Sequence, residues 1–210
     1  MTHFNTIQKG AQNMGVDLAD STLQTLVNYL TMLQKWNKAY NLTAIRDVEQ
    51  MIHLHILDSL AVLPFITGQK IIDVGTGPGL PGMILAICLP QKQFTLLDSN
   101  GKKTRFLTQV AMELGITNVV VANERVEQHP HQGEYDHVVS RAFASLVDMI
   151  NWTLPLPNES GNFLAMKGTY PEAEIQALPD SVQVDKVVAL QVTNVAAERH
   201  LVLMTRKGHL

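Results

Sequence analysis

The sequence predicts an α/β protein built on a doubly wound, mostly parallel sheet of seven strands. Three observations carry this prediction. From residue 69 onward, short apolar runs alternate with amphipathic segments, which is the pattern of parallel strands joined by crossover helices. A glycine-rich loop follows the first of these runs. The last two strand-like segments are so close in sequence that only an antiparallel hairpin can join them.

The N-terminal part of the chain has a different rhythm. Residues 1–65 have helical spacing and are predicted to form a helical extension packed on a core domain of residues 66–210. Ser21 is placed to cap one helix. Asp47 and Gln50 are spaced as a capping box for another, which Pro64 would limit.

The strands and helices of the core domain are predicted from the apolar pattern and from the turn residues between them. Five short apolar runs predict the parallel strands, at residues 70–74, 94–97, 118–122, 136–140 and 162–166. The segments 81–89, 102–114 and 146–154 predict helices. Residues 182–195 and 199–205 form the predicted closing hairpin, with its turn at 194–198.

The composition narrows the class of protein. The chain has 210 residues, a net charge of −3 and a pI near 6.2, which argues against a long basic tail for nucleic acid. A single cysteine fits a reducing compartment. The sequence contains no apolar run long enough to span a membrane and no signal-like N-terminus, so we expect a cytoplasmic protein without a membrane partner.

The loop from Asp73 to Gly82 is the strongest signal of a binding site. Gly75, Gly77 and Gly79 allow the backbone to approach a ligand closely at the start of a helix. The two prolines of the loop each remove a backbone donor, which weakens it as a cradle for pyrophosphate. The loop therefore suits a neutral nucleoside with an amino-acid tail better than a dinucleotide.

Asp98 is the second signal, because it follows the second predicted strand. An acid at this position can accept hydrogen bonds from ribose hydroxyls. Both NAD sites and S-adenosylmethionine (SAM) sites use such an acid, so the spacing alone does not choose between them. Asp98 could also serve as the N-cap of the following helix.

Basic residues follow the later strands and supply further candidates. Arg141 lies after the fourth strand, where it could pair with a ligand carboxylate or an RNA phosphate, or cap a helix. Lys167 ends the fifth strand and could be a site residue or a solvated one. A set of possible RNA contacts consists of Lys102, Lys103, Arg105 and Arg199. No His or Cys spacing typical of a metal site is present, so no metal is predicted.

Several motifs together resemble one family. The chain is similar to the bacterial small-subunit rRNA guanine-N7 methyltransferases, called RsmG or GidB, from about residue 14 to residue 206. The motifs that carry the resemblance are 73–82, Leu97-Asp98-Ser99, 140–146, Met166-Lys167-Gly168, 35–43 and 55–59.

This resemblance implies a Rossmann-like class I fold that binds SAM and methylates N7 of guanine 527 in 16S rRNA. Separately, the mild acidity of the chain leads us to expect a 30S particle or its precursor as the substrate, and we expect a monomer. It implies SAM contacts from Gly75, Leu80, Val126, Glu127 and Arg141. The glycine loop and the ribose argument add Gly77, Gly79 and Asp98. Guanine N7 carries a lone pair and no proton, so Arg141 and Lys167 are expected to position the base rather than act as acid or base.

Two other readings stay open. A SAM-dependent methyltransferase acting on another RNA site, a small molecule or a protein would share the glycine loop. It would lack the motifs at 35–43 and 55–59. A non-catalytic nucleotide-binding module, such as an NAD sensor, would share the loop as well, but the closing hairpin and the two loop prolines speak against it.

Overall fold

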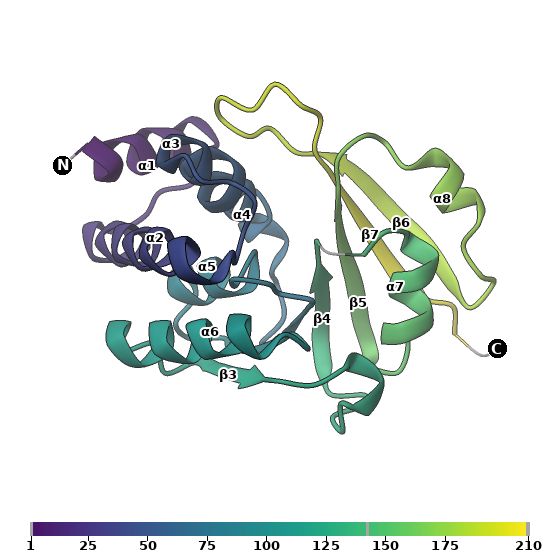
Figure 1. The fold of residues 1–210 in the computed structure, drawn as a ribbon. Helices are drawn as coiled ribbons and strands as arrows, with labels where there is room; N and C mark the ends of the chain where they lie inside the picture. Colours follow the sequence, from purple (N-terminus) through teal and green to yellow (C-terminus); the bar gives the residue numbers. More distant parts are fainter. Residues whose placement is uncertain (1, 142, 209–210) are drawn as a thin grey trace.

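The computed structural model describes residues 2–141 and 143–208, and it shows a seven-stranded sheet between two layers of helices (Figure 1). The strand order is β3-β2-β1-β4-β5-β7-β6, parallel from β3 to β5 and antiparallel at β7 and β6. The strands are β1 (Lys70–Val74), β2 (Gln93–Leu97), β3 (Val119–Ala122), β4 (Tyr135–Ser140), β5 (Pro157–Lys167), β6 (Val182–Ala189) and β7 (His200–Arg206). The predicted fold class is confirmed.

The helices divide between the two faces of the sheet. The N-terminal group contains α1 (Thr2–Asn13), α2 (Asp20–Tyr40), α3 (Val48–Met51), the π-helix η1 (Ile52–Leu57), α4 (Asp58–Leu60) and the short 3-10 helix η2 (Leu63–Phe65). The remaining helices are α5 (Gly82–Cys88), α6 (Gly101–Leu114), the 3-10 helix η3 (Val126–Gln128), α7 (Leu146–Thr153) and α8 (Glu172–Gln176). In Figure 1 the N-terminal group lies on the same side of the sheet as α5 and α6, and α7 and α8 lie on the other side.

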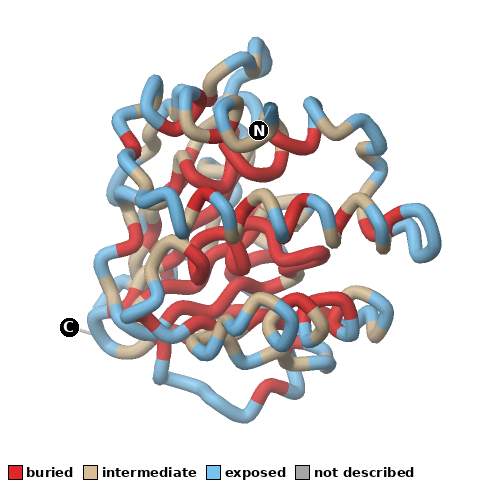
Figure 2. The backbone as a smooth tube through the Cα atoms, turned by 90° about the vertical axis from the view of Figure 1, so that its left-hand side faces the viewer, coloured by how far each residue is buried: buried red, intermediate tan, exposed pale blue. Residues whose placement is uncertain are grey.

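Two hydrophobic clusters follow from the alternation of side chains along the strands. Ile71 belongs to the cluster that includes the N-terminal helices, α5 and α6, whereas its neighbour Ile72 belongs to the cluster with α7. Figure 2 shows the buried residues concentrated in the sheet and on the inner faces of the helices. The first 60 or so residues thus share a continuous core with one face of the sheet.

Several sequence-based details were wrong. Ser21 does not cap α2: the helix begins at Asp20 after Ala19, and no side chain caps it. The predicted continuous helix after Asp47 is interrupted by six residues of π-helix, although Asp47 does cap its start by accepting a hydrogen bond from Gln50 N. Hydrophobic spacing cannot distinguish these forms, because an i, i+4 stripe tolerates one wider turn.

The C-terminal part differs from prediction in length rather than topology. β5 extends over 11 residues, beginning at Pro157 rather than near Asn162. β6 ends at Ala189, so residues 190–199 form a longer connection than the predicted turn at 194–198. This connection packs on the N-terminal helices, where Thr193 Oγ1 donates to Gly10 O at 2.9 Å. Contacts with the N-terminal helices therefore position residues 190–199, in place of strand pairing within the hairpin.

Candidate active site

The loop after β1 is held in its shape by glycine and by a buried carboxylate. Gly75, Gly77 and Gly79 all have positive φ, of 70°, 62° and 102°. A Cβ at Gly79 would lie 2.5 Å from Met83 Cβ, so only glycine fits there. At Gly77 the nearest atom to such a Cβ is Lys103 Nζ at 4.0 Å, so this part of the loop leaves open space beside it.

The side chain of Asp73 stabilises the loop through two hydrogen bonds. Its Oδ2 accepts hydrogen bonds from Thr76 Oγ1 and from Gly82 N, both at 2.7 Å. The side chain is completely buried, and this burial raises the pKa of Asp73 to about 6. From the other side, Tyr29 of α2 donates its hydroxyl to Pro78 O at 2.8 Å. The N-terminal extension therefore contacts the glycine loop directly.

Asp98 lies opposite this loop at the end of β2. Its Oδ2 accepts a hydrogen bond from Gly77 N at 2.9 Å and lies 3.8 Å from Lys103 Nζ, and its Oδ1 accepts from Asn100 N at 2.8 Å. The N-cap of α6 is Asn100, whose side chain accepts from Lys102 N. Asp98 is therefore not the helix cap, and it stays available to the cavity that it lines.

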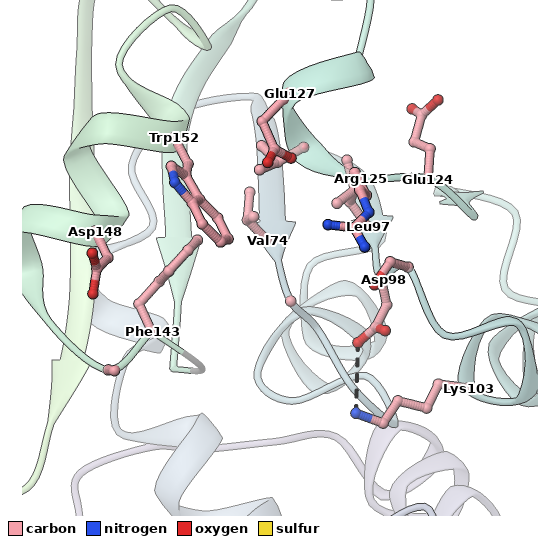
Figure 3. Close-up of a pocket in the computed structure, with 14 residues that line it drawn as sticks. Val74, Leu97, Asp98, Lys103, Glu124, Arg125, Glu127, Phe143, Asp148 and Trp152 are labelled. Carbon is pink, nitrogen blue, oxygen red and sulfur yellow. Dashed lines mark ion pairs between the residues drawn. The ribbon is translucent and has the colours of Figure 1, made fainter.

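A cavity of about 520 Å³, here called the Asp98 cavity, opens at the carboxyl ends of β1, β2 and β4 (Figure 3). Ligands of open α/β sheets bind at this edge. The lining residues are Val74, Gly75, Leu97, Asp98, Ser99, Lys103, Glu124, Arg125, Val126, Glu127, Phe143, Ala144, Asp148 and Trp152. Asp98 and Arg125 face Phe143 and Trp152 across the cavity, and the two aromatic rings meet edge to face with centroids 5.8 Å apart.

The structure places the predicted cofactor residues in three locations. Gly75, Asp98, Val126 and Glu127 line the Asp98 cavity. Within the described part of the chain, Gly77, Gly79 and Leu80 belong to the supporting loop rather than to the lining, and Leu80 is only 2% exposed. Arg141 lies elsewhere, in the cavity described next.

Sequence reasoning assigned no role to the two aromatic residues of the wall. Phe143 was part of the motif 140–146, of which Ala142 lies outside the described residues. Trp152 lies within the predicted helix 146–154, and it is half exposed although it is a large apolar residue. A large apolar residue outside the apolar stripe of this predicted helix was the one signal in the sequence that Trp152 has a role.

A second cavity, of about 390 Å³, has Arg141 in its lining and is here called the Asp58 cavity. Its lining residues are Ile45, Leu54, His55, Asp58, Arg141, Met166, Lys167, Gly168, Leu190, Arg199 and His200. The buried carboxylate of Asp58 accepts from Arg141 Nη1 at 3.1 Å and from Arg199 Nε at 2.9 Å. Arg141 Nη1 also donates to Leu54 O.

Two more polar residues of the Asp58 cavity, Lys167 and His55, contact other polar side chains. Lys167 Nζ lies 2.9 Å from Glu174 Oε2, which also accepts from Leu146 N. His55 Nε2 lies 2.9 Å from Thr43 Oγ1. Burial, together with the positive charge of Arg141, lowers the pKa of His55 to about 4, so the imidazole is neutral at pH 7.

The predicted RNA-binding cations do not form one surface. Lys102 and Arg105 are exposed on α6, whereas Lys103 faces Asp98 and lines the Asp98 cavity. Arg199 lies in the Asp58 cavity, at the start of β7. Across residues 2–141 and 143–208, no cluster of His, Cys, Asp and Glu has the arrangement needed to hold a metal ion.

Comparison with known proteins identifies the family. The family model described as GidB, rRNA small subunit methyltransferase G, matches residues 22–202. A "Ribosomal RNA small subunit methyltransferase G" from Marinomonas sp. (strain MWYL1) is 77% identical over 208 residues, which cover 99% of this chain and 100% of the relative. One from Alteromonas mediterranea is 51% identical, covering 95% of this chain and 94% of the relative.

Solved structures at low identity share the fold. A SAM-dependent methyltransferase from Aquifex aeolicus aligns with a TM-score of 0.59 at 15% identity, over 74% of this chain and 92% of that one. A ribosomal protein L11 methylase from Lactobacillus delbrueckii subsp. bulgaricus gives a TM-score of 0.57 at 19% identity, over 77% and 80%. These structures show the fold, while the family model and the relatives above show that the chain belongs to the GidB family of methyltransferases, the rRNA small subunit methyltransferase G proteins.

Proposed function

We propose that the protein transfers a methyl group from SAM to N7 of guanine 527 in 16S rRNA. Membership of the family supports rRNA methylation with SAM as the donor. The observation in the structure that carries the proposal is the Asp98 cavity, whose carboxylate stands where ribose hydroxyls are bound in this type of fold. The identity of the methylated nucleotide rests on the family resemblance.

The residues of the Asp98 cavity fit SAM in size and in charge. A volume of 520 Å³ is within the range of about 300–1,000 Å³ that small-molecule sites occupy. Val74, Leu97 and Val126 offer apolar surface to an adenine ring. Four acidic residues, Asp98, Glu124, Glu127 and Asp148, outnumber the two basic ones, Lys103 and Arg125. An acidic lining favours a cationic sulfonium over the negatively charged pyrophosphate of NAD.

Glu124 is the acid least available to a cofactor. Its Oε1 lies 2.6 Å from His129 Nδ1, and in Figure 3 its side chain points away from Trp152 and Phe143. Glu127, by contrast, extends beside Trp152. We therefore propose Glu127, Val126, Gly75 and Asp98 as the direct contacts, and Gly77, Gly79 and Leu80 as the loop that shapes the floor.

The reaction places few demands on acid or base groups. Bound SAM supplies a methyl group that is already activated on a positively charged sulfur. Guanine N7 offers an in-plane lone pair, so the protein has to align donor and acceptor, which contributes about 7–11 kcal/mol in favourable cases. We propose Arg141 and Lys167 as positioning groups on the acceptor side. Arg141 is also the residue assigned to SAM by resemblance, and its hydrogen bonds to Asp58 and Leu54 favour the acceptor side.

We also propose the substrate particle and the cell compartment of the reaction. The net charge of −3 leads us to propose that a ribonucleoprotein, the 30S particle or its precursor, supplies part of the binding surface to a monomeric enzyme in the cytoplasm. In the described part of the chain, none of the helices has the length and apolarity needed to cross a membrane. Efficient, site-selective methylation of protein-free 16S rRNA would contradict the need for a particle.

Mapping the methylated nucleotide tests the proposal. Methyl-labelled SAM is incubated with the protein and with 30S particles from cells that lack this enzyme, and the labelled nucleotide is located by chemical cleavage specific for N7-methylguanine. We expect one label, at guanine 527. A label at another RNA position, or on a small molecule only, would favour the alternative substrate. Binding of NAD in place of SAM would contradict the whole proposal.

A further inference from the structure

The Asp58 cavity is built from four segments that are far apart in the sequence. Leu54, His55 and Asp58 come from the N-terminal helices, and Arg141 follows β4. The end of β5 and the two ends of the hairpin connection supply most of the rest, and Ile45 precedes the N-terminal helix α3. In Figure 1 the connection 190–199, drawn in yellow-green, reaches from the hairpin to the N-terminal helices. His53 Nδ1 lies 3.1 Å from Thr193 O, which fixes that connection in place.

The charge of this cavity differs from that of the protein as a whole. Arg141, Lys167 and Arg199 are three cations around one buried carboxylate, Asp58, in a chain of net charge −3. Lys167 has a further partner, Glu174, outside the lining. Arg199 binds Asp58 through Nε and Glu198 O through Nη1, so its Nη2 can still donate to an anion. The orientation of the guanidinium is fixed before any ligand arrives.

An exposed aromatic residue lies beside the same cavity. Tyr170, in the loop between β5 and α8, is 54% exposed. Its ring meets the imidazole of His200, a lining residue, edge to face with centroids 5.6 Å apart. His200 is itself held by a 2.7 Å contact between Nδ1 and Gly168 O. An exposed ring fixed next to a cationic cavity is the arrangement that binds unpaired bases and their phosphates.

The position of this cavity relative to the Asp98 cavity fits group transfer. Phe143 and Ala144 line the Asp98 cavity, and Arg141, three residues before Ala144, lines the Asp58 cavity. A small void of about 10 Å³ beneath this segment shares Phe143 with the first cavity and Arg141 and Lys167 with the second. The two cavities therefore share neighbouring lining residues through this void, which brings a donor in one close to an acceptor in the other.

From these observations we propose that the Asp58 cavity takes up one unpaired nucleotide of the RNA substrate. Arg199 binds a flanking phosphate, and the neighbouring base stacks on Tyr170 at the rim. The cavity volume of 390 Å³ accommodates a single nucleotide rather than a duplex. This inference rests on the proposed function, because an RNA substrate is what brings such a nucleotide to the site. It adds a binding role for Tyr170 and His200, residues that the sequence analysis did not select.

The test compares Tyr170→Ala with Tyr170→Phe, in the full-length protein saturated with S-adenosylhomocysteine. Anisotropy of a fluorescently labelled, short single-stranded RNA measures binding, and methylation of 30S particles measures kcat and KM. Loss of one base–aromatic stack predicts that Tyr170→Ala weakens RNA binding, and raises KM, by about tenfold. Tyr170→Phe should bind like the wild type, since the ring is retained. The SAM affinity should not change in either variant.

Two controls separate this inference from a general surface effect. Met112→Ala removes another exposed large apolar side chain, 73% exposed on α6, and should leave RNA binding unchanged. Arg199→Gln should weaken RNA binding and reduce the slope of log K against log salt concentration by about one. The inference is overturned if Tyr170→Ala binds RNA as well as Met112→Ala does, or if Tyr170→Phe binds RNA as weakly as Tyr170→Ala. It is also overturned if Tyr170→Ala weakens the binding of double-stranded RNA as much as that of single-stranded RNA.

Failure of this inference can be told apart from failure of the proposed function. If the wild type methylates guanine 527 and Tyr170→Ala does so with the same KM, the Tyr170 site is wrong and the function stands. If the wild type methylates a different RNA nucleotide, the function is wrong, while the anisotropy comparison still decides whether the cavity binds unpaired RNA.

Discussion

The Asp98 cavity and the Asp58 cavity lie next to each other, but they are built in different ways. The lining of the first comes from strand ends, loops and helices of consecutive β-α units, between Val74 and Trp152. The second combines the N-terminal helices, the ends of β4 and β5, and the closing hairpin. The Asp98 cavity needs only consecutive β-α units to pack side by side in the sheet, whereas the Asp58 cavity exists only when four distant segments have docked.

Their electrostatics differ in the same way. Acidic residues are in excess in the Asp98 cavity, and basic residues are in excess in the Asp58 cavity. A methyl donor with a sulfonium and an acceptor attached to phosphates need opposite environments within a short distance. We propose that the two cavities, adjacent and opposite in charge, separate donor from acceptor before any chemistry occurs.

The largest expected effect concerns His55 in the Asp58 cavity, where Arg141 and Asp58 are its charged neighbours. Its pKa is about 4 in the folded protein and about 6.5 in the unfolded chain. Between these values the unfolded chain binds a proton that the folded protein does not, so stability falls as the pH falls from 6.5 to 4. The loss attributable to His55 is about 3 kcal/mol. Urea unfolding at several pH values measures it.

His55→Gln should reduce this acid destabilisation, and His131→Gln, on an exposed loop, should not. The same histidine should matter little to turnover, because N7 needs no general base. Replacing His53 or His55 should leave methyl transfer largely intact at pH 7 to 8. A complete loss of transfer in a folded variant would contradict the idea that catalysis proceeds by positioning alone.

The next effect concerns cofactor affinity in the Asp98 cavity. Asp98→Ala removes the carboxylate proposed to accept the ribose hydroxyls and also the acceptor for Gly77 N. With about 1.5–3 kcal/mol for a charged hydrogen bond, we expect SAM binding to weaken on the order of 100-fold in calorimetric titration. Asp98→Asn keeps one acceptor and should lose less. SAM binding of wild-type strength in Asp98→Ala would refute the ribose assignment.

A smaller loss is expected at the aromatic wall. Trp152→Ala should weaken SAM binding by about tenfold, because stacking on a base contributes about 1–3 kcal/mol. The chain has two tryptophans, and Trp36 lies outside both cavities. SAM should therefore change the fluorescence of Trp152, and Trp152→Phe should abolish this signal while largely preserving affinity. An unchanged signal in Trp152→Phe would place the ligand elsewhere.

The smallest effect on SAM affinity is expected at Lys103, which was predicted to bind RNA and lines the proposed SAM cavity. Its ion pair with Asp98 is long, at 3.8 Å, and a third of its side chain is exposed, so the pair contributes little. Lys103→Ala should change SAM affinity by less than about threefold. If Lys103 also contacts RNA phosphate, the variant should lower the salt dependence of RNA binding by about one ion. A large loss of SAM binding would instead assign Lys103 to the cofactor.

Much of the fold could be predicted because it depends on local patterns. The strands β1 to β4 and the helix α6 lie within one or two residues of their predicted limits, and Gly115 ends α6 with φ of 65°. The π-helix at Ile52–Leu57 and the ten-residue connection after β6 could not be predicted, because packing between distant segments decides them. The division of the chain at residue 65 stays a prediction.

By itself, the sequence determined the succession of the seven strands and of α5, α6 and α7 along the chain, the glycine loop and the place of Asp98, because each depends on residues close together in the chain. Only the tertiary structure decided that Trp152 faces Asp98, that Arg141 and Arg199 share Asp58, and that Tyr170 stands beside His200. Ion pairs and ring contacts between segments up to 141 residues apart leave no local pattern, since only the docking of the elements brings their partners together.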